Sequence, residues 1–93
     1  MASVMRVAAG SSVKNVAMCL VRFMEKPGAR DVELRAIGAG AVNQAVKAIA
    51  AARRALLDRG ADLRVKVDFF DAEEKTAVRF VAFLKDERRA RHE

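Results

Sequence analysis

The residues best suited to binding a ligand gather at a turn near the middle of the chain. Gly38 and Gly40 allow backbone conformations and close contacts there that a side chain would block. A predicted helix follows, and the unpaired N–H groups at its start can bind a phosphate. Asn43 and Gln44 lie in its first turn, and Lys47 lies one turn later on the face of Asn43. These groups could meet a phosphate or a base edge. In the alternative interpretation, Asn43 and Gln44 are local caps of an ordinary strand–turn–helix joint.

A second turn of the same kind precedes the first predicted helix. Ser11 or Ser12 can cap that helix by accepting a hydrogen bond from a free backbone N–H, and Lys14 and Asn15 follow at its start. Because both turns follow parallel strands, we expect them at the same end of the sheet, where ligands collect in open α/β folds. Arg35, near the end of the second strand, would add a cation to this edge.

Hydrophobic periodicity predicts the elements that hold these turns. Two segments carry apolar residues at spacings of three and four, which is typical of a helix with one buried face. Two others alternate apolar and charged residues, as a strand buried on one face does, and two apolar runs complete the set. The pattern predicts strands over residues 4–9, 31–36, 63–69 and 76–84, and helices over residues 13–25 and 41–59.

This order predicts an α+β two-layer sandwich, β-α-β-α-β-β, with a four-stranded mixed sheet. Right-handed crossovers would place both helices on one face of the sheet. The third strand would direct Leu63, Val65, Val67 and Phe69 towards them. The other face is left to charged residues, namely Glu33, Arg35, Arg64, Lys66 and Arg79.

The length of 93 residues fits one domain over residues 1–84, followed by a charged tail over residues 85–93. Hydrophobic residues make up 53% of the chain, but many are alanines, so the core is thin and a partner subunit would stabilise it. With 18 basic and 12 acidic residues, the net charge is +6. This charge suits a polyanionic partner or, more simply, a solvated basic surface.

Residue usage argues against several kinds of site. The only histidine, His92, lies in the tail without cysteine neighbours, so we expect neither a metal nor a cofactor. No nucleophile–base arrangement or nucleotide-binding motif occurs, so we do not expect an enzyme. An aromatic stacking platform is weakly supported, because Phe69 and Phe80 are predicted in the core, with Phe70 and Phe83 as exceptions.

Location follows from similar observations. No apolar run is long enough to span a membrane and no signal peptide is visible, so we expect no membrane association. The single cysteine, Cys19, cannot form an internal disulfide, which favours the cytoplasm. Its place in the apolar pattern of the first helix predicts at least partial burial.

The segment from Glu33 to Arg53, ELRAIGAGAVNQAVKAIAAAR, resembles the signature of the stage V sporulation protein S family, small bacterial proteins of the Alba-like superfamily. Its most specific part spans residues 36–50. The resemblance extends to residues 5–7 and 12–16 and, more weakly, to residues 62–67 and 74–77. The resemblance covers roughly residues 4–84 and leaves out the tail.

The resemblance implies an Alba-like fold, a homodimer or higher homo-oligomer, and contact with nucleic acid. In Alba proteins a lysine at the start of the first helix contacts nucleic acid, and Lys14 is the matching residue. Alba proteins also carry a long basic hairpin between the last two strands. Here residues 70–74 form a short acidic turn instead, and the stage V sporulation proteins are similarly short at this point.

Two functions are consistent with these observations. The first is salt-sensitive, weakly sequence-selective binding of DNA or RNA, for which the candidate residues are Ser12, Lys14, Asn15, Arg35, Gly38, Gly40, Asn43, Gln44 and Lys47. The alternative is a self-assembling regulatory protein of the sporulation type that does not bind nucleic acid. Its expected interface residues are Ala48, Ala51, Ala52 and Ala55 of the second helix and the outward Val81 and Phe83 of the last strand.

Overall fold

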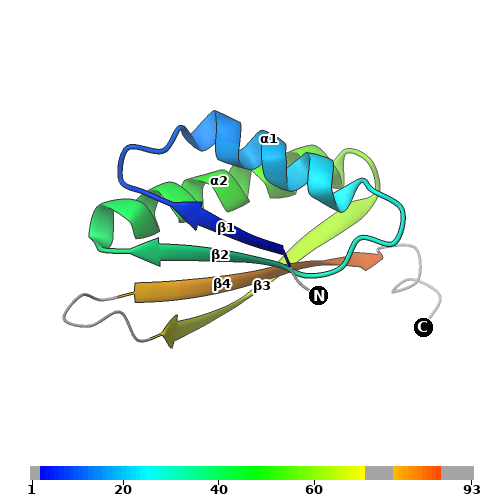
Figure 1. The fold of residues 1–93 in the computed structure, drawn as a ribbon. Coiled ribbons are helices and arrows are strands. Elements are labelled where there is room, and N and C mark those ends of the chain that lie inside the picture. The colour runs from blue at the N-terminus through cyan, green and yellow to red at the C-terminus, as the bar shows by residue number, and fades with distance from the viewer. Residues whose placement is uncertain (1–2, 71–76, 87–93) are drawn as a thin grey trace.

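The computed structural model of the chain describes residues 3–70 and 77–86 as four strands and two helices in two layers (Figure 1). Both helices lie on one face of the sheet, which confirms the predicted α+β sandwich and its element order. Each predicted boundary falls within two residues of the observed one. The elements are β1 (Ser3–Val7), α1 (Val13–Met24), β2 (Val32–Ile37), α2 (Ala39–Leu57), β3 (Ala61–Phe70) and β4 (Ala77–Asp86).

The strand order in the sheet is β1-β2-β4-β3. Strands β1 and β2 are parallel, whereas β4 runs antiparallel to both β2 and β3. The parallel pair β1 and β2 therefore ends at one edge of the sheet, and each of its strands leads from that edge into a helix. This topology brings the two strand–helix turns to the same edge, as the sequence predicts.

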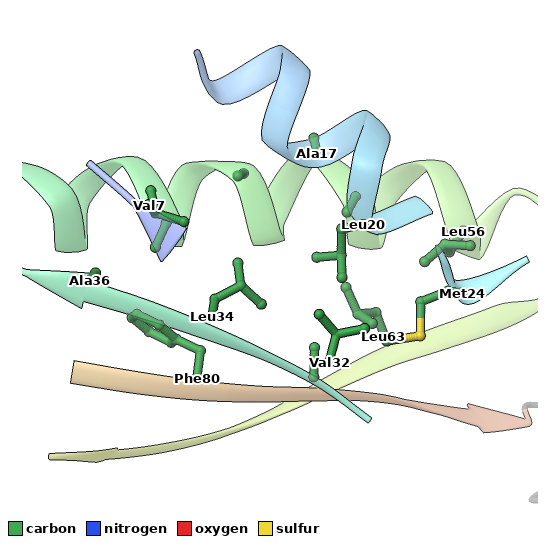
Figure 2. Packing of buried hydrophobic residues seen from close by; sticks show 14 of the residues in the cluster. Val7, Ala17, Leu20, Met24, Val32, Leu34, Ala36, Leu56, Leu63 and Phe80 are labelled. Carbon is green, nitrogen blue, oxygen red and sulfur yellow. The ribbon is translucent and has the colours of Figure 1, made fainter. Parts of the chain in front are cut away.

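The core lies between the sheet and the helices. Val32, Leu34 and Ala36, alternate residues of the central strand β2, are fully buried. Figure 2 shows Leu34 and Val32 on the helix side of the sheet, with Leu20 of α1 above them. Helix α2 faces the sheet with small side chains, which let the helix and the sheet approach closely. Its buried residues are Ala41, Ala45, Ala48, Ala52 and Leu56.

The helices cover only part of β3. Leu63 is buried and Val65 is half-buried, but Val67 is 64% exposed and Phe69 is 74% exposed. Figure 1 shows β3 diverging from α2 towards its carboxyl end, so no helix covers these two side chains. The prediction of Phe69 in the core is therefore wrong, whereas Phe80 is buried as predicted. Alternation identifies the face of a strand, but it does not say how far a helix extends over that face.

Three helical residues also differ from expectation. Cys19 is exposed, because it lies on the outer side of α1, away from the buried Ala17 and Leu20. Ala48 and Ala52, expected at an interface with a second subunit, are fully buried within the core. They pack inside their own chain and are not accessible to another subunit.

Candidate functional site

The turn between β1 and α1 is held by its two serines. The Oγ of Ser11 accepts a hydrogen bond from the backbone N–H of Ala8 at 2.9 Å. The Oγ of Ser12 accepts one from the N–H of Asn15 at 3.2 Å, which confirms Ser12 as the N-cap of α1. These bonds order the turn within its own segment, while the side chain of Asn15 stays exposed.

The turn between β2 and α2 depends on its glycines for two different reasons. Gly38 has a φ of 91°, a left-handed conformation that favours glycine, and it is the N-cap of α2. Gly40 lies against the first turn, because a Cβ at this position would stand 2.9 Å from the Cβ of Ala9. The first glycine shapes the turn, and the second lets the two turns touch.

A side-chain hydrogen bond joins helix α2 to the first of these turns. The Nε2 of Gln44 donates to the backbone carbonyl of Ser11 at 2.8 Å, and the Nδ2 of Asn43 lies 3.5 Å from the Oε1 of Gln44. Helix α2 has no side-chain cap, so the interpretation of Asn43 and Gln44 as local caps is wrong. Residues 8–12 and 37–40 are named the paired turns below.

The surroundings of the paired turns are positively polarised. Lys14 is exposed near the start of α1, and Lys47 is exposed further along α2 than Asn43. Neither α1 nor α2 has an acidic residue in its first turn, so no side chain there neutralises the positive end of either helix dipole. Backbone N–H groups at a helix start are suited to an anion, and Lys14 is the cation in the first turn of α1.

Arg35 lies apart from these residues, on the helix-free side of the sheet, which is named the open face below. It forms an ion pair with Glu33 of the same strand, and its guanidinium carbon lies 5.7 Å from the centroid of the Phe70 ring. Arg6 on β1 and Arg79 on β4 are its partners in the strand register. Three arginines therefore cross the sheet in one row.

A hollow of about 430 Å³ connects the open face with the first of the paired turns. Arg6, Arg35 and Phe70 line its sheet side, and Ala8 and Ala9 line the side of the turn. Sequence reasoning placed neither Arg6 nor Phe70 at the site. The signal was present, because each residue alternates with inward neighbours and so belongs to the same face as Arg35.

Asp62, near the start of β3, is a buried acid that the sequence pattern did not indicate. Its carboxylate accepts hydrogen bonds from the Nε of Arg64 at 2.6 Å and from the Nε of Arg53 at 3.1 Å. The hydrogen bond from Arg64, with the positive charges of both arginines, lowers the pKa of Asp62 against the effect of burial, which would raise it. Arg53 thus joins α2 to β3, and Arg64 holds the same carboxylate from within β3.

The described residues offer neither a metal site nor a membrane-spanning helix. Among residues 3–70 and 77–86, no group of three or more histidine, cysteine, aspartate or glutamate side chains is arranged to hold a metal ion. Neither of the two helices described here has the length and apolar character needed to cross a membrane. The predicted acidic turn at residues 71–74 and His92 lie outside the described residues.

Comparison with known protein families matches residues 3–85 to the family described as Stage V sporulation protein S (SpoVS). The match includes the paired turns, both helices and nearly all of the sheet. The family resemblance predicted from residues 33–53 is therefore confirmed.

Proposed function

The chain belongs to the stage V sporulation protein S family, a family of sporulation-related proteins, and from that premise we propose that it binds nucleic acid, DNA or RNA, through the paired turns. One observation carries the proposal: two helix N-termini meet at one edge of the sheet, tied by the Gln44 hydrogen bond to Ser11. A phosphate at this edge would meet backbone N–H groups and the exposed Lys14. The family is not a known enzyme family, and the proposed role is binding, not catalysis.

The chemistry of the paired turns determines the kind of binding that we expect. Amide N–H groups and a lysine recognise phosphates, which every nucleic acid carries, and they do not read base edges. The net charge of +6 would attract a polyanion from a distance. Binding should therefore be weakly sequence-selective and should weaken steeply as salt is added, because each phosphate contact releases condensed counterions.

Lys14→Glu tests the proposal. Binding of labelled single strands, DNA duplex and RNA duplex is measured by fluorescence anisotropy at low and physiological salt. We expect weaker binding of every probe and a salt slope that is smaller by about 1, as for the loss of one phosphate contact. Lys26→Glu is the matched control, because it makes the same charge change just beyond the other end of α1.

Two results would contradict the proposal. If Lys14→Glu and Lys26→Glu weaken binding equally, net charge and not the paired turns governs the affinity. If wild type binds no probe at low salt, where a basic domain binds most readily, the nucleic-acid function itself is wrong.

We also propose that the chain assembles into a homodimer. A separate observation, an exposed apolar patch, supports this proposal. Val46, Val67 and Phe69 form an apolar patch beside α2 and are 50%, 64% and 74% exposed. A groove of about 500 Å³ runs along the patch and is lined also by Val78 and Phe80. Exposed apolar patches of this kind often mark protein–protein contacts. The patch supports assembly better than the buried Ala48 and Ala52 do.

Sedimentation equilibrium over a range of concentrations tests this second property. Wild type should be dimeric, and Phe69→Asp should be monomeric, because a charge in the patch would have to be desolvated on association. Ile37→Asp is the control, since Ile37 is 48% exposed at the end of β2 and outside the patch. A wild-type protein that stays monomeric at high concentration would contradict the assembly proposal.

The proposed location is the cytoplasm. The thiol of Cys19 is exposed, and a free exposed thiol is better preserved in a reducing compartment. Tagged protein recovered with its thiol oxidised from living cells would contradict this location.

A further inference from the structure

Three arginines stand side by side on neighbouring strands of the open face, an arrangement that does not stabilise the fold. Arg6 stands opposite Arg35, and Arg35 stands opposite Arg79. Like charges directly opposite each other on neighbouring strands destabilise a sheet. Glu33 pairs with Arg35 and Asp68 lies 3.5 Å from Arg79, but Arg6 makes no ion pair with any residue that the structure describes. The row therefore keeps an excess of positive charge that a ligand of negative charge would compensate.

Two aromatic rings lie on the same face, each with a cation over the ring. The guanidinium carbon of Arg35 lies 5.7 Å from the centroid of Phe70, and the Nζ of Lys66 lies 5.6 Å from the centroid of Phe83. Both phenylalanines are half-buried, so each keeps part of its surface accessible. Phe69 is the neighbour of Phe70 in the chain, but alternation places it on the opposite face. An accessible ring next to a cation is the kind of surface on which an unpaired base stacks.

The spacing of these groups suits an extended ligand. Phe70 stands opposite Ala77, and Phe83 stands opposite Arg64 further along the β3–β4 pair. The six residue steps from Ala77 to Phe83 correspond to about 20 Å of strand. Arg79 lies between these two positions on β4, so the arginine row crosses the path from one ring to the other. The hollow of about 430 Å³ opens beside Phe70 and provides room for a planar group.

We propose that the open face binds a single-stranded nucleic acid, with unpaired bases stacked on Phe70 and Phe83 and phosphates placed along Arg6, Arg35 and Arg79. This inference rests on the proposed function and deepens it by naming an unpaired strand as the ligand and a second surface as its site. A duplex keeps its bases stacked inside the helix and gains nothing from the two rings. The open face therefore discriminates single strands from duplexes, which the phosphate contacts of the paired turns do not.

Leucine substitutions at the two rings test the inference. Probes are an oligouridine and an oligothymidine of about 12 nucleotides, which span more than the two stacking positions. We expect Phe70→Leu and Phe83→Leu each to weaken binding of the single strands by about tenfold, because each removes one stacked base. Duplex binding should not change. Phe23→Leu, which alters a half-buried ring on α1 that also has a cation over it, Lys26 at 5.9 Å, is the control and should bind both kinds of probe as wild type does.

Photocrosslinking of the wild-type protein gives a second readout that does not depend on how the variants fold. The same single strands carrying 5-iodouracil are irradiated with the protein, and the crosslinked peptides are identified by mass spectrometry. The chain has no tryptophan or tyrosine, so aromatic crosslinks must fall among its five phenylalanines and its one histidine, His92. Crosslinks at Phe70 or Phe83 support the inference, and crosslinks only at other residues overturn it. The stronger of the two probes, RNA or DNA, identifies the sugar that is preferred.

Lys14→Glu in the same assays separates this inference from the proposed function. Single-strand binding that is lost in the Phe70 and Phe83 variants but retained in Lys14→Glu supports the open face and contradicts the paired turns. Binding that is lost in Lys14→Glu but retained in both leucine variants overturns the open face and leaves the proposed function standing. No binding of any probe by wild type at low salt contradicts both.

Discussion

Asp62→Asn should destabilise the domain substantially at neutral pH. The buried carboxylate accepts hydrogen bonds from Arg53 of α2 and Arg64 of β3, so it holds the helix layer to an outer strand of the sheet. Hydrogen bonds to charged groups contribute about 1.5–3 kcal/mol each. Both arginine side chains are about half exposed, at 51% and 49%, so water screens the interaction. We therefore expect a net loss of about 2 kcal/mol in the free energy of unfolding, or about 10 °C in the melting temperature.

The pH dependence of this effect has a definite sign. The pKa of Asp62 is lowered in the folded protein from its ordinary value of 3.8, mainly by the hydrogen bond from Arg64. Between the two pKa values the unfolded chain binds more protons than the folded one, so stability rises with pH in that interval. The contribution of Asp62 is fully present above the unfolded-state pKa and is lost as the pH falls through the folded-state pKa. Wild type and Asp62→Asn should therefore differ most at neutral pH and converge in strong acid.

Far-ultraviolet circular dichroism is the appropriate assay, because the chain lacks the tryptophan and tyrosine that fluorescence would need. Asp68→Asn is the matched control on the same strand. The Asp68 side chain is 71% exposed and lies 3.5 Å from Arg79, so its loss should change stability by less than about 0.5 kcal/mol. The reasoning is refuted if Asp62→Asn melts at the wild-type temperature at pH 7, or if the difference between them persists unchanged in strong acid.

Three further changes probe the core and the paired turns. Leu34→Ala removes a fully buried side chain from the central strand and should lower the free energy of unfolding by about 3 kcal/mol. Urea unfolding should show a lower midpoint. A midpoint near that of wild type would show that neighbouring side chains fill the cavity. Ser12→Ala removes the cap of α1 and should cost about 1 kcal/mol, with faster amide exchange at Asn15; unchanged exchange there would mean that the cap does not hold the turn. Gly38→Ala forces a side chain into a φ of 91° and should cost about 1–2 kcal/mol in thermal melts, whereas Gly10→Ala, at a position without a positive φ, should cost less; equal costs would contradict the role of the backbone angle.

The local spacing of apolar and polar residues predicts most of the fold. Val32, Leu34 and Ala36 alternate with charged residues in the sequence, and all three are fully buried under the helices. Such a pattern identifies an element and its inward face, because burial and side-chain direction share the same period. It does not identify how far another layer reaches, so Val67 and Phe69 have the right direction but no helix above them.

Of the candidate site, the sequence predicts only what the order of strands and helices determines, which is that the two turns meet. Two turns at the carboxyl ends of parallel strands must lie at one edge, and the Gln44 hydrogen bond to Ser11 agrees with that expectation. The choice of Gln44 as the bridge depends on a contact between residues 33 positions apart, and no local pattern encodes it. The burial of Asp62 is non-local in the same way, because Arg53 reaches it from α2. Arg35 is close to the second turn in sequence, and its alternation with buried neighbours predicts the helix-free face, where the structure places its side chain.

The hydrogen bond between Gln44 and the Ser11 carbonyl makes the paired turns one cooperative unit. The first turn cannot move away from α2 without breaking this bond, and the two turns cannot separate without losing the close approach of Gly40 to Ala9. Amide protons of the two turns should therefore exchange with solvent through a shared opening event, although the turns belong to distant parts of the sequence. A ligand that orders one turn also orders the other, so the second contact forms with little further loss of conformational entropy. Two weak phosphate contacts at this edge would then bind as a single event.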